Sequence, residues 1–111
     1  MTRLEADPFH TLDQSSAIAD GAVRPYYLSD RKLRVSVTRV DGRLYAFDDL
    51  CVCADERCPL SGGLLTGTTI MCQCHGSRFD IATGAVISGP ATQALNVREV
   101  QEVEGIIQIR A

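Results

Sequence analysis

The sequence contains no tryptophan, only 5% aromatic residues and no long apolar run. A membrane-spanning helix needs about 20 consecutive apolar residues, and no stretch of this chain approaches that length. The first ten residues, MTRLEADPFH, also lack the apolar core of a signal peptide. We therefore expect a cytoplasmic protein that has no membrane partner.

A strong net charge is missing as well. The formal net charge is −3, and 11 Lys and Arg residues are scattered among 14 Asp and Glu residues. Nucleic-acid-binding surfaces need basic residues gathered on one face, so we expect no nucleic-acid partner. At 111 residues and 45% hydrophobic composition, the chain fits one compact domain, residues 1–111. We expect a monomer or a weak oligomer.

Helical periodicity and internal repeats are absent too, and short strand-like runs between turn signals predict an all-β fold. The clearest strand is LRVSVTRV, residues 33–40, in which apolar and polar residues alternate. Asp41-Gly42 is a two-residue hairpin signal, and RLYAF, residues 43–47, follows it as the partner strand. This hairpin leads directly toward the first cysteine, Cys51.

Two further segments complete the expected fold. Near the C-terminus, ALNVREV, residues 94–100, and GIIQIRA, residues 105–111, predict a second hairpin that turns at Glu104-Gly105 and closes the sheet. DQSSAIADG, residues 13–21, fits either a short helical turn or a loop. His10 lies on a predicted first strand, where we expect a surface or packing role.

The sequence does contain a cluster of cysteines. All five lie in CVCADERCPLSGGLLTGTTIMCQC, residues 51–74, and His75 follows directly. In a reducing cytoplasm, clustered cysteines more often hold a metal or perform redox chemistry than form a disulfide framework. Residues 51–91 are rich in Gly, Ser, Thr, Pro and Cys, which is typical of loops that wrap an inserted site.

The second half of this cluster has the spacing of a ligand loop. In Cys72-x-x-His75, followed by Gly76, two side chains on one tight loop can converge on a metal while glycine lets the backbone turn away. Cys74 is adjacent to His75 and is expected to point elsewhere. Cys72 is therefore the preferred thiol ligand of this loop.

The first half supplies a second loop, Cys51-x-Cys53, and Cys58 could compete with either of these thiols. If each loop sends one ligand to each iron of a [2Fe-2S] cluster, Cys51 and Cys72 share one iron. Cys53 and His75 then share the other. Three cysteines and one histidine also make a closed tetrahedral zinc site, so spacing alone leaves both metals open.

The stretch resembles the Rieske ferredoxin family, whose signature is Cys-x-His, a spacer, and Cys-x-x-His-Gly with a following aromatic-Asp pair. CQCHGSRFD matches the second half in full. CPLSGGLLTGTTI resembles the spacer, ATGAVISGPA the later turn and proline loop, and VDGRLYAFDDLC the approach to the first ligand. The resemblance spans roughly Val35 to Gln108, and several motifs in the right order make it specific.

The resemblance implies a Rieske-like antiparallel β sandwich or barrel. Its base would be about residues 8–50 and 92–111, with an inserted cluster-binding subdomain of two loops at about 51–91. It also implies one [2Fe-2S] cluster and a one-electron carrier between a ferredoxin reductase and a terminal oxygenase. An aromatic-ring dioxygenase or a cytochrome P450 system is the expected setting. The electron would pass through the exposed edge of His75.

One position departs from the family pattern. CVCADERC has Cys53 where the family carries a histidine, and His10 does not replace it. The resemblance therefore implies three cysteine ligands and one histidine ligand: Cys51, Cys53, Cys72 and His75. It further implies that Cys58, which precedes Pro59, is the mate of Cys74 in a disulfide, although the oxidation state of this pair stays open.

Other residues take narrower roles from the resemblance. Ser77 matches a serine whose hydroxyl can donate to an inorganic sulfide, and Pro90 lies in the loop that shields the cluster. Phe79 stands where high-potential members carry a tyrosine donor, and it also fits a plain core aromatic. The acidic residues near the first loop fit solvated surface or a docking patch. These are Asp48, Asp49, Asp55 and Glu56.

Three classes of function remain to be compared. No mononuclear-iron ligand set or nucleotide-binding glycine loop is recognisable, so we expect an electron-transfer component and not an enzyme. The alternative is a structural zinc-binding module with a Cys3His site, although a stand-alone zinc fold would not need the surrounding Rieske motifs. A third alternative is a ligand-depleted Rieske-like subunit, against which the four spaced ligands argue.

Overall fold

The structure, a computed structural model, describes residues 9–50, 59–74, 76–89, 91 and 93–110. These residues form eleven β-strands and two short 3-10 helices, η1 and η2, so the predicted all-β class is confirmed. The strands pair antiparallel in three sheets. No helix among the described residues is long and apolar enough to cross a membrane.

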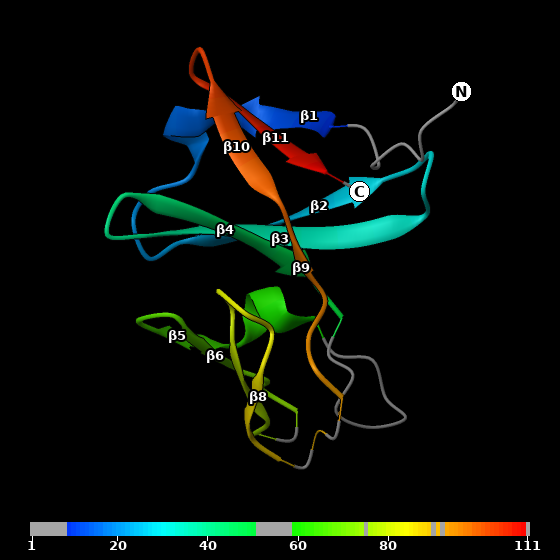
Figure 1. Cartoon of the computed structure of the whole chain (residues 1–111), viewed down its shortest axis with the longest axis vertical. Coiled ribbons are helices and arrows are strands. Elements are labelled where there is room, and N and C mark those ends of the chain that lie inside the picture. Colours follow the sequence, from blue (N-terminus) through cyan, green and yellow to red (C-terminus); the bar gives the residue numbers. More distant parts are fainter. Residues whose placement is uncertain (1–8, 51–58, 75, 90, 92, 111) are drawn as a thin grey trace, which may run out of the picture.

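The three sheets follow one another along the long axis of the molecule (Figure 1). The first has the order β1-β11-β10 and consists of β1 (Phe9–Gln14), β11 (Ile106–Arg110) and β10 (Val100–Val103). The second has the order β2-β3-β4-β9 and consists of β2 (Val23–Leu28), β3 (Leu33–Val40), β4 (Arg43–Asp48) and β9 (Val97–Arg98). The third consists of β5 (Leu64–Thr66), β6 (Thr69–Met71), β7 (Arg78–Asp80) and β8 (Val86–Ser88) in that order.

The first hairpin forms as predicted. β3 and β4 pair from Val40 opposite Arg43, around a two-residue turn. Asp41 and Gly42 in that turn have φ values of 51° and 81°. Positive φ at both central residues gives the turn whose twist matches the flanking strands, which is why Asp-Gly is a strong hairpin signal.

The second hairpin differs from its prediction on one side. β10 and β11 pair around Glu104-Gly105, as expected, but the first strand begins at Val100 and not at residue 94. Val97 lies opposite Phe47, so β9 extends the second sheet. The chain crosses to the first sheet at Glu99, whose carbonyl accepts the backbone N–H of Arg110 at 2.8 Å. The expected strand 94–100 is therefore divided between two sheets.

The N-terminal part of the fold bears on two expectations, the role of His10 and the structure of the segment 13–21. His10 lies on β1, and its Nε2 is 2.9 Å from Oδ2 of Asp30. Asp30 is exposed, so this contact agrees with the surface role, one of the two alternatives expected for His10. Within the segment 13–21, Ser15–Ala17 forms the helix η1, so the helical-turn alternative is correct.

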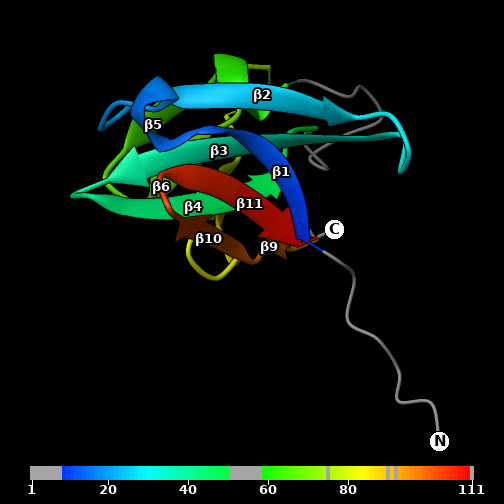
Figure 2. The ribbon, with the colours of Figure 1, turned by 90° about the horizontal axis from the view of Figure 1, so that it is seen from above.

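Two hydrophobic cores lie on opposite sides of the second sheet. Seen from above, β1 and β11 lie across β2, β3 and β4 (Figure 2). Val35 and Val37 of β3 are fully buried there with Ile107 and Ile109. Between the second and third sheets, a second core gathers around Phe47 of β4. Its buried members are Phe47, Leu60, Ile70, Cys72, Phe79, Ile81, Ala91 and Leu95.

The alternating strand β3 has no exposed face over its central residues. Ser36 and Thr38, on the face opposite Val35 and Val37, are also fully buried. The hydroxyl of Thr38 donates to the carbonyl of Ala22 at 2.5 Å, and Ser36 bonds to a buried carboxylate described below. Alternation correctly predicted a strand, but both of its faces are covered because sheets lie on either side.

Candidate metal centre

Several of the predicted site residues lie outside the described part of the chain. The structure describes Cys72, Cys74, Ser77 and Phe79. Those outside it are Cys51, Cys53, Cys58, His75 and Pro90. Within the described residues, no group of three His, Cys, Asp or Glu side chains could hold a metal ion. Only one of the four predicted ligands, Cys72, belongs to that part of the chain.

The second ligand loop connects two paired strands. β6 ends at Met71 and β7 begins at Arg78, and these two residues lie opposite each other. Inside the loop, the backbone N–H of Cys72 donates to the carbonyl of Ser77 at 2.8 Å. The N–H of Gly76 donates to the carbonyl of Cys72 at 2.9 Å. The loop is thus closed at its base by its own backbone.

Gly76 makes this closure possible. Its φ is +78°, in the left-handed region that residues with a side chain rarely adopt. The glycine expected to turn the backbone away after Cys-x-x-His is therefore present and required here. The loop has the tight geometry predicted from its sequence.

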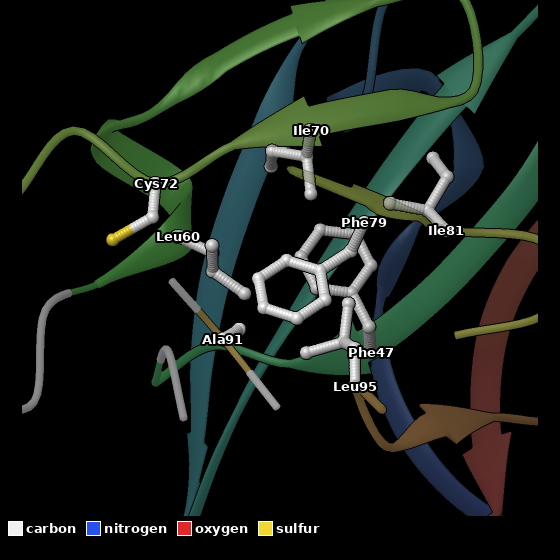
Figure 3. Close-up of a cluster of buried hydrophobic side chains, with 8 residues drawn as sticks. All are labelled: Phe47, Leu60, Ile70, Cys72, Phe79, Ile81, Ala91 and Leu95. Carbon is white, nitrogen blue, oxygen red and sulfur yellow. The ribbon is translucent and has the colours of Figure 1, made fainter. Parts of the chain in front are cut away.

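Cys72 stands at the edge of the second core, and its side chain is fully buried. Its sulfur points away from the rings of Phe47 and Phe79 (Figure 3). Cys72 is not disulfide-bonded. A buried thiol that faces away from the apolar core, at the base of a closed loop, fits a metal ligand.

Cys74 differs from Cys72 both in its exposure and in its bonding. It is exposed, and it is disulfide-bonded. A sulfur held in a disulfide is not available as a thiolate, which is the form that binds iron or zinc. This contrast favours Cys72 over Cys74 as the ligand supplied by this loop.

Ser77 is fully buried directly behind the ligand loop. Its hydroxyl oxygen accepts the backbone N–H of Ala91 at 2.9 Å. Because the oxygen is the acceptor in this bond, the hydroxyl hydrogen remains available for a second bond. A serine so placed fits a donor to an inorganic sulfide, and it ties the loop to the segment beside Pro90.

Phe79 is the centre of the apolar packing and not of the polar site. It is fully buried, pairs with Ile70 across the third sheet, and packs beside Phe47 and Leu60 (Figure 3). The core-aromatic interpretation is confirmed. The ring fixes the third sheet, and therefore the base of the second ligand loop, against β4.

The expectation for the acidic residues is wrong for Asp49. This carboxylate is fully buried and accepts hydrogen bonds from Arg34 and Ser36. The side chain of Asp48 is 18% exposed, and its Oδ1 lies 2.8 Å from Nε of Arg98. Asp48 is therefore a partly buried, ion-paired carboxylate and not a fully solvated surface charge. Asp55 and Glu56 lie outside the described residues. The missed signal is that Asp49 follows Phe47 by two positions, which puts both on one face of an extended chain.

The Rieske [2Fe-2S] domain family matches residues 9–103 of this chain. The chain belongs to this family. Among curated proteins, the ferredoxin component of the naphthalene 1,2-dioxygenase system of Pseudomonas putida is 34% identical over 86 residues. That alignment covers 78% of this chain and 79% of the relative. Membership in the Rieske family implies one [2Fe-2S] cluster. The curated relatives are ferredoxin components, so the chain is an electron-transfer component of an oxidoreductase system.

Solved structures agree with this assignment. A ferredoxin of Sphingomonas yanoikuyae B1 is 30% identical and superposes with a TM-score of 0.84, covering 94% of this chain and 99% of that one. A chain in the complex of reduced oxygenase and oxidised ferredoxin of carbazole 1,9a-dioxygenase also matches. It is 30% identical, with a TM-score of 0.83 and 92% of each chain covered. The Rieske-like arrangement of sheets is thereby confirmed.

Proposed function

We propose that this Rieske protein is a one-electron carrier that takes electrons from a ferredoxin reductase and delivers them to a terminal oxygenase. The observation that carries the proposal is the full-length likeness to ferredoxin chains, including one in complex with an oxygenase. A curated relative also serves a dioxygenase system as its ferredoxin component. The acceptor would be an aromatic-ring dioxygenase or a cytochrome P450.

The proposed ligand set is Cys51, Cys53, Cys72 and His75. A bound [2Fe-2S] cluster supplies the capacity to accept and release one electron. The protein's own contribution is to hold the ligands in place. Cys72 is supported by its burial, its orientation and the closed backbone of its loop. Cys53 in place of a histidine is the specific feature of this chain.

The surrounding residues would tune and protect this site. The hydroxyl of Ser77, which its bond to Ala91 leaves able to donate, would bond a sulfide. Pro90, next to Ala91, would cover the ligand loops. We place the base at about residues 8–50 and 92–111 and the cluster-binding subdomain at about 51–91. A cytoplasmic monomer or weak oligomer fits a carrier that must meet two partners in turn.

The direct test is to purify the protein aerobically and measure iron, acid-labile sulfide, visible absorption and EPR before and after dithionite. The proposal predicts two irons and two sulfides per chain, a coloured oxidised form and an EPR signal that appears on reduction. A colourless protein with one zinc would establish the alternative Cys3His module. A protein with no bound metal would instead support the ligand-depleted subunit.

Electron delivery needs a separate assay. The reduced protein is mixed anaerobically with a dioxygenase terminal component, and reoxidation is followed by visible absorption. The ferredoxin of the naphthalene system serves as the positive control. Reoxidation that depends on the oxygenase supports the proposal. The proposal would be contradicted by a protein that carries its full cluster and is reduced by dithionite, but that no reductase of such systems reduces and no oxygenase reoxidises.

A further inference from the structure

The first ligand loop is closed at its base by paired backbone. Leu50 and Pro59 form an isolated antiparallel bridge, and residues 51–58 lie between them in sequence. Leu60 then begins the helix η2 (Leu60–Gly62), a short green coil between the second and third sheets (Figure 1). The chain thus leaves the second sheet and returns to it at neighbouring points.

Asp49 bonds across this base with both its backbone and its side chain. Its carbonyl accepts the N–H of Leu60 at 2.5 Å. Its Oδ1 accepts the N–H of Ser61 at 2.8 Å, and its Oδ2 accepts the hydroxyl of Ser61 at 3.2 Å. A residue that precedes the loop therefore holds two consecutive residues that follow it.

The same carboxylate is anchored to the second sheet. Its Oδ1 also accepts the hydroxyl of Ser36 at 2.6 Å, and its Oδ2 accepts Nε of Arg34. The backbone N–H of Asp49 donates to the carbonyl of Arg34 at 2.9 Å. The carboxylate is fully buried, so its charge is compensated by these donors and not by water.

We propose that Asp49 is a positioning residue for the first ligand loop. By fixing both ends of residues 51–58 to β3, it sets the separation and orientation in which Cys51 and Cys53 are presented to the metal. Loss of the carboxylate would remove both bonds to Ser61 and so loosen the returning end of the loop, while the backbone bond from Leu60 and the pairing of the sheet remain. This inference rests on the proposed [2Fe-2S] ligand set.

Asp48 provides a matched control. It adjoins Asp49 and also pairs with an arginine, Arg98, at 2.8 Å. Its second donor is the side-chain amide of Asn96 at 3.2 Å. These contacts join β4 to β9 and to the residue before it, within the second sheet, whereas those of Asp49 join the two ends of the loop. Asp48→Ala therefore removes a carboxylate–arginine pair without opening the loop base.

The test compares purified holoprotein of the wild type, Asp49→Ala, Asp49→Asn and Asp48→Ala. Cluster retention is measured as the rate of visible bleaching in the presence of an iron chelator, at a temperature where far-UV circular dichroism shows every variant folded. The EPR spectrum of each reduced protein is recorded in parallel. A residue that only supports the fold would change unfolding without changing the EPR spectrum of the folded protein.

We expect Asp49→Ala to lose its cluster about tenfold faster than Asp48→Ala, and to show shifted EPR g values. Asp49→Asn keeps a carbonyl oxygen that can accept the N–H of Ser61, so it should fall between them. Equal bleaching rates and unchanged spectra for the Asp49 variants and Asp48→Ala would overturn the inference. If Asp49→Ala does not fold, the test rests on Asp49→Asn. A bleaching rate and EPR g values equal to those of the wild type in Asp49→Asn would then overturn the inference. A wild-type protein that contains no iron and no sulfide would instead overturn the proposed function, on which this inference rests.

Discussion

The hydroxyl oxygen of Ser77 accepts the backbone N–H of Ala91, with 2.9 Å between the two atoms. Ser77 is fully buried and Ala91 is 6% exposed, so water cannot readily replace either partner. The bond joins the end of the second ligand loop to the segment that follows β8. One side chain therefore couples the base of the second ligand loop to the segment after β8, which we propose to be the loop that covers the metal site.

Replacing Ser77 with alanine should have two effects. The unpaired N–H of Ala91 should lower the free energy of unfolding by about 1–3 kcal/mol. Loss of a hydroxyl donor to the cluster sulfur should also lower the reduction potential. Urea unfolding and a redox titration measure the two effects. Ser88→Ala, at an exposed position on β8, should change neither. An unchanged potential in Ser77→Ala would mean that this hydroxyl does not bond the cluster.

Single alanine substitutions should separate ligands from neighbouring cysteines. Cluster loss is expected in Cys51→Ala, Cys53→Ala, Cys72→Ala and His75→Ala. Because binding of the metal stabilises the fold, these four should also unfold at a lower temperature. Cys58→Ala and Cys74→Ala should keep their visible spectrum. A colourless but folded Cys58→Ala protein would show that the wrong thiol was assigned.

The disulfide of Cys74 gives a chemical prediction. We propose Cys58 as its partner, because the family resemblance implies a clamp between the two ligand loops. Of the five cysteines, three should then react as thiols after the cluster is removed and the protein is denatured without reductant. Peptide mapping should recover residues 58 and 74 on one linked fragment. Five reactive thiols would show that the bond does not form in the isolated protein.

Tyr26 gives a prediction for alkaline pH. Its hydroxyl donates to Oδ2 of Asp13 at 2.9 Å and so links β2 to β1. Burial, and then the hydrogen bond to Asp13, raise the pKa of Tyr26 above its ordinary value of 10.0. The folded state therefore holds this proton more tightly than the unfolded state. The resulting stability is complete below pH 10.0 and is lost as the pH rises through the folded pKa.

Tyr26→Phe tests this directly. The variant should lose about 1 kcal/mol of unfolding free energy at neutral pH, because the hydrogen bond is removed. Its stability should then fall less steeply than that of the wild type above pH 10.0. Tyr27→Phe is the control, since Tyr27 is 63% exposed. Parallel pH profiles for wild type and Tyr26→Phe would contradict the assigned role.

The sequence predicted those elements whose signals are local. Asp41-Gly42 specified a hairpin because two positive φ angles suit that dipeptide and its twist. Gly76 specified the turn of the second ligand loop for a similar reason. The strand at 94–100 was mispredicted because its division at Glu99 depends on partners distant in sequence. Phe47 pairs with Val97, and Arg110 bonds the carbonyl of Glu99.

In the candidate site, too, local features could be predicted from the sequence, and features that depend on distant residues could not. The ligand spacing around Cys72 is a local pattern, and it led to the correct family. The burial of Asp49 is not local, because its donors come from positions far along the chain, including Arg34 and Ser61. An aspartate before a loop ordinarily indicates exposed surface. The one local signal for the burial of Asp49 is its position two residues after the buried Phe47.

The central claim is that Cys53 is an iron ligand where the family pattern has histidine. A thiolate adds a negative charge that a neutral imidazole does not, so the cluster accepts an electron less readily. All-cysteine plant-type ferredoxins have potentials of about −400 mV, and two-histidine Rieske centres lie at roughly −150 to +300 mV. With three thiolates and one imidazole, this protein should fall between the plant-type value and the upper Rieske range.

The most direct measurement is the reduction potential of Cys53→His beside that of the wild type, by redox titration followed with EPR. The variant restores two histidine ligands, and we expect it to assemble a cluster with a clearly higher potential and Rieske-like g values. A Cys53→His protein that assembles its cluster with an unchanged or lower potential would contradict the account, because Cys53 would then not bind iron.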